Sequence, residues 1–347
     1  MEPFAIPVID ISGDETRRVV IAQGTPTAYK GHPTTLLMPD NKTMYCVYPL
    51  GHGRPSAVLR RSDDAGLTWS PPLDTPANWK ESNNCPALYR FVGPDGVERL
   101  FVFEGHGRMR QAVSTDGGTT WSPMKPNGLP TIMPFTAIIE LTDGRLMGGW
   151  NWQKATWLSF SADGGLTWSK ERLLVKGDGK FPGAWPAEPC FIRSPDGKQI
   201  ACLLRENSRK YNSLALFTDD EGATWGEPRE LPRTLTGDRH QPRYSQDGRL
   251  VIPFRDMAAA SPTHGHFCAW VGTYDDIAQG RPGQYRLKLL HSHAGGDCGY
   301  PGLELLPDGT FVATTYCKLR PGPEKQSVAS VRFKLSEIDA MAEKLPR

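Results

Sequence analysis

Long apolar runs are missing from this sequence. No stretch of its 347 residues offers the roughly 18 consecutive apolar residues that a membrane-spanning helix needs. Blocks of Lys and Arg are missing too, since 40 basic and 38 acidic residues are scattered along the chain and leave a net charge of +2. Phosphate backbones are bound by clustered basic side chains, so nucleic acid is not an expected partner, and neither is a membrane.

A secretory signal is also missing, because the first residues carry neither a basic nor an apolar segment. This predicts a cytoplasmic protein, or a secreted or periplasmic one if a leader had been removed. The seven cysteines are odd in number and never form a CxxC pair, which predicts buried free thiols rather than disulfides or a zinc site. Two His-x-His pairs, at 264–266 and 291–293, lack a carboxylate at ligand spacing beside both. Neither a metal nor another cofactor is therefore predicted.

Turn-forming residues are abundant, with 36 glycines and 31 prolines. Four segments share the pattern Ser/Thr-x-Asp-x-Gly-x-Thr-Trp at intervals of about 50 residues: 62–69, 114–121, 161–168 and 218–225. Asp and Ser or Thr can bond nearby backbone N–H groups, Gly supplies a left-handed position, and Trp can pack the turn onto a sheet. The pattern therefore predicts four equivalent tight turns between strands.

A second repeat consists of short apolar runs that flank a polar turn. It occurs six times, also at intervals of about 50 residues, around Asp40, Asp95, Asp143, Asp196, Asp247 and Asp308. Four strands per unit and six units predict an all-β fold, a six-bladed β-propeller, as a single domain over residues 1–347. Only residues 335–344 are expected to be helical, as a short C-terminal helix.

A proline precedes each of these polar turns by five to nine residues, and proline suits the first residue of a strand. These strands are predicted to be the innermost ones, so the residues just before the prolines should line a central funnel: His32, Cys85, Met133, Glu188, Gln241 and Tyr300. The second strands end on the same rim, near 48–54, 104–108, 150–152, Arg205, Arg255 and Tyr316. One pocket would thus collect carboxylates, arginines, aromatics and histidines.

These residues resemble the sialidase (neuraminidase) superfamily, whose Asp boxes and six-bladed propeller match the two repeats. Residues 299–309 are similar to the stretch that holds the family's nucleophilic tyrosine, which implies Tyr300. Residues 187–192 are similar to the segment of the glutamate that activates it, which implies Glu188. Residues 203–207 and 252–256 lie where the second and third carboxylate-binding arginines fall, which implies Arg205 and Arg255.

Two departures from the family pattern stand out. Its first arginine belongs in the stretch 30–33, where this chain has Gly31, so a third arginine is absent unless Lys30 or Arg54 substitutes. Its acid/base aspartate belongs in the loop 48–54, which holds no carboxylate. His52 is the titratable group there, and His106 lies in a second Gly-His-Gly-Arg motif one blade later, so both are candidate catalytic residues.

The leading hypothesis is therefore an exo-glycosidase, sialidase-like, that removes a terminal acidic sugar from a glycan. Tyr300 and Glu188 would attack, and further substrate contacts are predicted for the residues His32, Arg54, Arg205, Gln241, Arg255 and Trp152. The departures leave a second hypothesis open, β-elimination on a uronic-acid glycan with Tyr300 or His52 as base. A third is a glycan-binding propeller without turnover.

Overall fold

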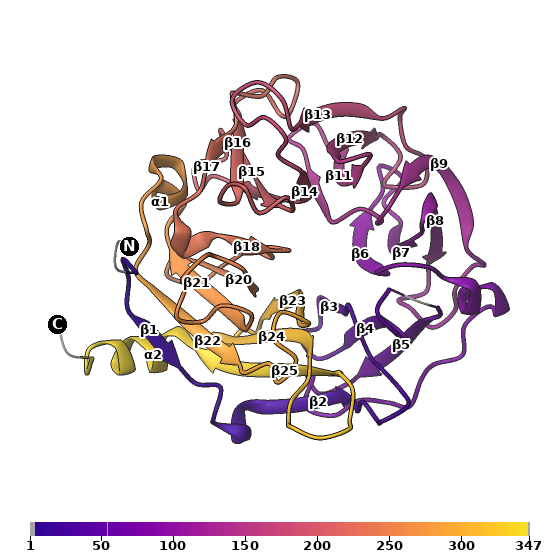
Figure 1. Cartoon of the computed structure of the whole chain (residues 1–347). Helices are drawn as coiled ribbons and strands as arrows, with labels where there is room; N and C mark the ends of the chain where they lie inside the picture. Colours follow the sequence, from indigo (N-terminus) through magenta and orange to yellow (C-terminus); the bar gives the residue numbers. More distant parts are fainter. Residues whose placement is uncertain (1–3, 54, 346–347) are drawn as a thin grey trace.

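The computed structural model describes residues 4–53 and 55–345, and these residues form six sheets arranged around a central axis (Figure 1). The fold prediction, an all-β propeller of six blades, is confirmed. In order from the axis, blade one contains β3 (Thr34–Leu37), β4 (Met44–Pro49) and β5 (Ala57–Ser62). Blade two contains β6 (Ala87–Val92), β7 (Glu98–Glu104), β8 (Gly107–Ser114) and β9 (Lys125–Thr131). Blade three contains β10 (Ala137–Glu140), β11 (Leu146–Trp152), β12 (Ala155–Ser161) and β13 (Arg172–Lys176).

The other three blades follow the same order with additions at the edges. Blade four contains β14 (Pro186–Arg193), β15 (Ile200–Glu206), β16 (Leu214–Thr218) and β17 (Arg229–Glu230). Blade five contains β18 (Gly237–Asp238) with β19 (Arg243–Tyr244), then β20 (Leu250–Asp256), β21 (Phe267–Gly272), β22 (Tyr285–Leu290) and β1 (Val8–Asp10). Blade six contains β23 (Gly299–Leu305), β24 (Thr310–Cys317), β25 (Ser327–Lys334) and β2 (Arg18–Ala22). The helices are α1 (Tyr274–Gln279), α2 (Leu335–Ala342) and the 3-10 turns Glu15–Arg17, Ala77–Glu81 and Arg233–Leu235. No helix in the described part of the chain has the length and apolar character that a membrane span would require.

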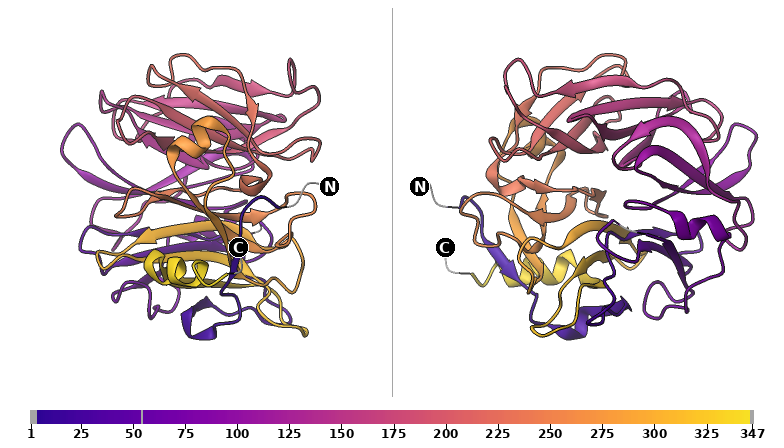
Figure 2. Two further views of the ribbon diagram at one scale, coloured as in Figure 1. Left: turned by 90° about the vertical axis from the view of Figure 1, so that its left-hand side faces the viewer. Right: turned by 45° about the vertical axis from the view of Figure 1, so that its right-hand side comes forward.

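The ring is closed by strands from the beginning of the chain. β2 pairs antiparallel with β25, with Arg18 opposite Val331, and β1 adds a parallel edge to β22 in the preceding blade. Figure 2 shows both ends of the chain on one side of the ring. Two consecutive blades are thus completed by the same N-terminal segment, which joins the first residues to the last blade.

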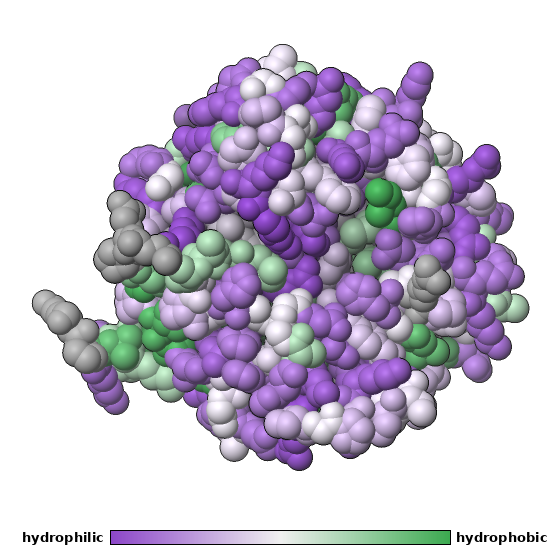
Figure 3. All heavy atoms as spheres, viewed as in Figure 1, coloured by the Kyte–Doolittle hydropathy of each residue, from purple (hydrophilic) through white to green (hydrophobic). Residues whose placement is uncertain are grey.

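The hydrophobic core lies between neighbouring blades rather than on the axis. Second strands such as β4, β20 and β24 are buried along their whole length, because each has a blade on both faces. Between blades one and two, for example, Tyr45 and Val47 of β4 pack in one cluster with Leu100 and Val102 of β7. The axis is left to other side chains, and hydrophilic residues gather around the central hollow of the face drawn in Figure 3. All seven cysteines are buried and free.

The four Asp boxes close the turns after the third strands of blades one to four. In the third blade the Asp163 carboxylate accepts the Ser161 hydroxyl at 2.8 Å, the Thr167 N–H at 2.9 Å and the Thr167 hydroxyl at 2.5 Å, while the indole of Trp168 donates to the Gly165 carbonyl at 3.1 Å. The strands alternate in direction, so these turns lie at the opposite end of the propeller from the residues that precede the innermost strands. The Asp boxes therefore stabilise the fold away from the funnel.

Replacing Asp163 with Ala should lower the free energy of unfolding by about 1 to 2 kcal/mol, because one side chain satisfies both a backbone and a hydroxyl donor of the turn. Denaturant unfolding would measure the change. Asp178→Ala is the control, since Asp178 is exposed and only pairs with Lys176 at 3.2 Å. Equal effects of the two substitutions would contradict this account of the Asp box.

Candidate functional site

Four of the six residues predicted to line the funnel adopt a left-handed backbone conformation that non-glycine residues seldom occupy. The φ angles are 38° at His32, 41° at Cys85, 50° at Glu188 and 56° at Tyr300, and each residue precedes a proline. The prolines were expected to open the innermost strands, but β14 and β23 both begin before their prolines. In each strand the pairing register with the next strand shifts around one residue, Glu188 in β14 and Tyr300 in β23, so the strand continues past it as a bulge. Such bulges redirect a side chain, here toward the axis.

Tyr300 and Glu188, contributed by blades six and four, meet at the centre. The Tyr300 hydroxyl donates to Glu188 Oε1 at 2.5 Å, and Arg205 Nη1 donates to the same oxygen at 2.8 Å. Arg205 Nη1 also lies 3.5 Å from the Tyr300 oxygen. Burial, and then the Glu188 charge, raise the pKa of Tyr300 well above its usual value, so the phenol is protonated in the empty site. The second oxygen of Glu188 is buried and has no hydrogen-bond partner among the residues that the structure describes.

Three arginines converge on one buried carboxylate, Asp238 of β18. Arg255 Nε and Nη2 donate to its Oδ2 at 2.9 and 2.5 Å, Arg209 donates to both oxygens at 2.6 and 2.7 Å, and Arg205 Nε lies 3.2 Å from Oδ1. Burial alone would raise the pKa of Asp238, but the charges of Arg205 and Arg255 and the bonds from Arg209 hold it well below its usual range. A carboxylate of the protein thus already occupies the arginine cluster.

The arginines differ in what they leave free. Arg255 Nη1 also donates to the Gly296 and Cys298 carbonyls at 2.6 and 3.2 Å, and only 11% of its side chain is exposed. The exposed fraction is 14% for Arg205 and 36% for Arg209. Arg209 is thus the most exposed of the three and lines a hollow with Glu206 and Lys210, whereas Arg205 lies beside Tyr300. Substrate binding by Arg205 and Arg255 stays a prediction.

His52 is held by a carboxylate from a distant loop. Its Nδ1 lies 3.3 Å from Asp297 Oδ1 and 3.1 Å from the Tyr29 oxygen, and the Tyr29 hydroxyl donates to the same carboxylate oxygen at 2.9 Å. Burial alone would raise the pKa of Asp297, but the hydrogen bonds from His52 and Tyr29 outweigh it and lower the pKa. Loop 48–54 lacks a carboxylate, and Asp297 supplies one from the segment just before Tyr300.

His32 connects this group to the tyrosine. Its ring centre lies 4.4 Å from that of Tyr300 and 4.6 Å from that of His52, in edge-on contacts. Burial, and then the charges of His52 and Arg255 themselves, lower the pKa of His32 well below its usual value, so the ring is neutral. Its Nδ1 is buried and finds no hydrogen-bond partner within residues 4–53 and 55–345.

Other predicted site residues lie apart from this group. His106 is exposed in the turn between β7 and β8. Glu104 nearby is buried, and its carboxylate accepts hydrogen bonds from the Ser82 hydroxyl at 3.1 Å and the Asn83 N–H at 2.7 Å. Trp152 is half-buried and accepts a bond from the Trp157 indole through its carbonyl at 2.9 Å. The Gln241 backbone bonds to Pro253, and among the described residues its side chain has no hydrogen-bond partner. Arg54 lies outside the described residues.

In blade five the residue before the proline, Gln241, was predicted to line the funnel, but Arg239 lies there instead. It has a φ of 56°, is buried, and its guanidinium carbon lies 5.6 Å from the ring centre of Tyr300. β18 and β19 are two-residue strands, so the spacing from the proline is not kept in this blade. Asp238, Arg209, Asp297 and Tyr29 were missed for a similar reason, since none occupies a repeat position. The one signal in the sequence was that such a residue can lie near a predicted one along the chain, as Asp297 lies shortly before Tyr300.

The histidines of the two His-x-His pairs partly assemble in another part of blade five. The ring centres of His266 and His291 lie 4.2 Å apart, and those of His291 and His293 4.7 Å apart. Within residues 4–53 and 55–345, no group of three or more His, Cys, Asp or Glu side chains is arranged to hold a metal ion.

Comparison with known proteins links this geometry to one fold. Residues 112–123, which contain the second Asp box, match the model of the BNR/Asp-box repeat family. The NanB sialidase of Streptococcus pneumoniae superimposes with a TM-score of 0.63 at 12% identity, covering 92% of this chain and 71% of that one. The chain has the sialidase fold. A protein of unknown function from Dyadobacter fermentans gives a TM-score of 0.69 at 18% identity, covering 91% and 98%.

The sialidase resemblance extends to sequence over part of the chain. A sialidase of Clostridium perfringens is 29% identical over 200 residues, which are 48% of this chain and 50% of that protein. The match thus spans about half the length of this curated relative. The predicted resemblance to the sialidases is confirmed, whereas the roles of individual residues in this sialidase-like propeller rest on the geometry above.

Replacing Asp238 with Asn should lower the free energy of unfolding by roughly 3 kcal/mol or more near neutral pH, because it leaves three partly buried arginines without their carboxylate. Denaturant unfolding across a pH series would measure this. The folded-state pKa of Asp238 is depressed, so its stabilisation is present above the ordinary Asp value of about 4 and is lost as pH falls toward the folded-state pKa.

The gap between the wild type and Asp238→Asn should therefore narrow below about pH 4. The surface substitution Asp178→Asn is the control and should change stability little at any pH. A gap that stays constant down to low pH would show that Asp238 does not act through its charge.

Proposed function

We propose that this chain is a glycan-active enzyme, a sialidase-like exo-glycosidase that removes a terminal acidic sugar with retention of configuration. The observation that carries the proposal is the 2.5 Å hydrogen bond from the Tyr300 hydroxyl to Glu188, held at the axis by two strained bulges. A tyrosine is a poor nucleophile while protonated and needs a base within hydrogen-bond reach. Glu188 is such a base, and both side chains are buried from competing water.

The first step would join the sugar to the tyrosine. Tyr300 Oη attacks the anomeric carbon and its proton passes to Glu188, while His52 gives a proton to the oxygen of the departing glycan. In the second step His52 takes a proton from water, which attacks the same carbon and releases Tyr300, and Glu188 returns the proton to the phenol oxygen. Asp297 would orient His52, and Arg205 would stabilise negative charge on the tyrosine oxygen.

The charge of the funnel supports an acidic sugar. Arg205, Arg209 and Arg255 surround the single carboxylate of Asp238, and Arg205 also contacts Glu188, so positive charge exceeds negative charge by one. A planar guanidinium with open donors binds carboxylates well. Arg205 lies beside Tyr300 and Arg209 is the most exposed of the three, and they are the side chains we expect to meet the carboxylate of the sugar.

Replacing Tyr300 with Phe should lower kcat for sugar release by about a thousandfold or more, because no other group can form the covalent intermediate. Mass spectrometry of the products from a panel of sialosides and uronosides would measure the release. Melting should change little, since Arg205 still pairs with Glu188. Tyr274→Phe is the control, because its hydroxyl bonds Gln199 at 3.0 Å in the outer part of the fold. Full activity of Tyr300→Phe would refute the nucleophile assignment.

Replacing His52 with Gln should slow glycans with poor leaving groups by about a hundredfold or more, and aryl glycosides with acidic phenols far less. The reason is that only a poor leaving group needs a proton from His52 as the bond breaks. Steady-state kinetics on matched alkyl and aryl glycosides would show this. His106→Gln, an exposed histidine away from Tyr300, is the matched control. Equal losses on both substrate types would argue against the acid role.

A specific observation also favours the second candidate, β-elimination on a uronic-acid glycan. His32 is neutral, has an unpartnered ring nitrogen and touches Tyr300, so the site holds a His–Tyr pair that can remove and return a proton. Elimination leaves an unsaturated uronate that absorbs ultraviolet light and adds no water, whereas hydrolysis adds water. Product mass and ultraviolet absorbance on uronate polymers separate the two reactions.

A further inference from the structure

A hollow of about 510 Å³ is lined in part by His52, and Tyr300 is not among its lining residues. Its wall includes Tyr29, Lys30 and Lys325 together with His52. Neither ammonium group forms a hydrogen bond or an ion pair within the described part of the chain; only their backbones are bonded, Lys30 to Gln326 and Lys325 to Thr25. Burial, and then the charge of Arg60, lower the pKa of Lys30, so an anion placed here would relieve an unfavourable environment.

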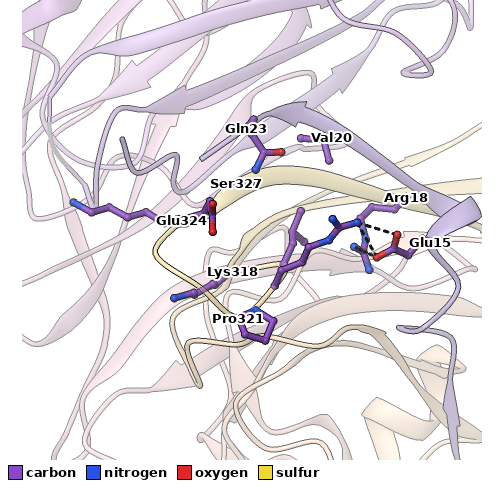
Figure 4. Close-up of a pocket in the computed structure, with 11 residues that line it drawn as sticks. Glu15, Arg18, Val20, Gln23, Lys318, Pro321, Glu324 and Ser327 are labelled. Carbon is purple, nitrogen blue, oxygen red and sulfur yellow. Dashed lines mark hydrogen bonds and ion pairs between the residues drawn. The ribbon is translucent and has the colours of Figure 1, made fainter. Parts of the chain in front are cut away.

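A second hollow, of about 520 Å³, adjoins the first one and shares Lys325 with it. Figure 4 shows how Arg18, Lys318 and Gln23 lie along it, on β2, after β24 and beside β25. Its basic side chains are Arg18, Lys318, Arg320 and Lys325, and its acidic ones are Glu15 and Glu324. Glu15 is engaged by Arg18 at 3.4 Å and by Arg320 at 3.1 Å. Both hollows are therefore positively charged overall.

The position of His52 gives this surface a role. In the proposed reaction the terminal sugar lies over Tyr300 and the bond to be cleaved lies at His52, so the rest of the glycan must extend beyond His52. The first surface that it meets is the wall with Lys30 and Lys325, and the second is the hollow of Figure 4. Together they are large enough for several sugar residues, since ligand pockets of 300 to 1,000 Å³ are usual for small molecules.

We propose that the two hollows form one basic groove that binds an anionic polysaccharide chain on the leaving-group side, with Lys30 and Lys325 pairing with carboxylates of the sugars next to the cleaved bond. The acidic residues of the substrate would then not be confined to its terminal sugar. This inference rests on the proposed function, because the direction in which the chain leaves is set by Tyr300 and His52. It is independent of the arginine cluster, because Arg205, Arg209 and Arg255 line neither hollow.

Binding is measured on Tyr300→Phe, which cannot turn over its ligand, with tetragalacturonate and its methyl ester as matched probes. Calorimetry should give tighter binding of the acid than of the ester, and the advantage should fall as salt is raised. Adding Lys30→Met and Lys325→Met should weaken binding of the acid by about tenfold and leave the ester unchanged. The control pair is Lys42→Met and Lys198→Met, two exposed lysines in turns at the opposite end of the propeller.

Equal binding of acid and ester, or equal losses in the two lysine pairs, would overturn the groove. Activity distinguishes this failure from failure of the proposed function. With Tyr300 restored, the groove pair should raise KM for an anionic polymer far more than KM for a small aryl glycoside. If no glycoside is cleaved while binding of the acid still depends on Lys30 and Lys325, the groove stands and the glycosidase proposal falls.

Discussion

Two buried carboxylates, Glu188 and Asp238, need cationic partners, and the arginines that provide them join three blades at the axis. Arg205 of β15 lies between both carboxylates, and Arg255 of β20 binds Asp238. Tyr300 of β23 joins this network through its hydrogen bond to Glu188. Burying one of these charges alone would be strongly unfavourable, so each carboxylate depends on its arginine partners. The funnel is therefore both the electrostatic link between blades four, five and six and the place where reactive groups meet.

Backbone geometry brings the tyrosine to this network. Gly299, just before Tyr300, has a φ of 109°, and a Cβ there would lie 2.9 Å from Arg255 Cβ, so any larger residue would push the two strands apart. The bulge that follows turns Tyr300 across the axis toward Glu188. The same loop carries Asp297, so one short segment places both the nucleophile and the carboxylate that holds His52.

Much of the fold could be predicted from the sequence because propeller blades repeat. Polar turns recur in all six units and Asp boxes in four of them, and their local hydrogen bonds depend on few distant contacts. Tyr300 and Glu188 were predictable because each precedes the proline that opens the first strand of its unit, and Arg205 because it lies at the end of a second strand. Asp238 and Arg239 were not, because irregular pairing of β18 and β19 breaks the offset in blade five. His106 shares the local motif of His52, but no carboxylate in the described part of the chain pairs with it, and that difference arises only in three dimensions.

Trapping the covalent intermediate tests the central claim, that Tyr300 assisted by Glu188 attacks the sugar. The protein would be incubated with a 2,3-difluorinated acidic sugar, whose fluorine atoms slow release of the intermediate, and its intact mass followed by peptide mapping. The account predicts a stoichiometric gain of one sugar on the peptide that contains Tyr300, and none in Tyr300→Phe. Turnover of a glycan without any such adduct, or an adduct on another residue, would contradict it.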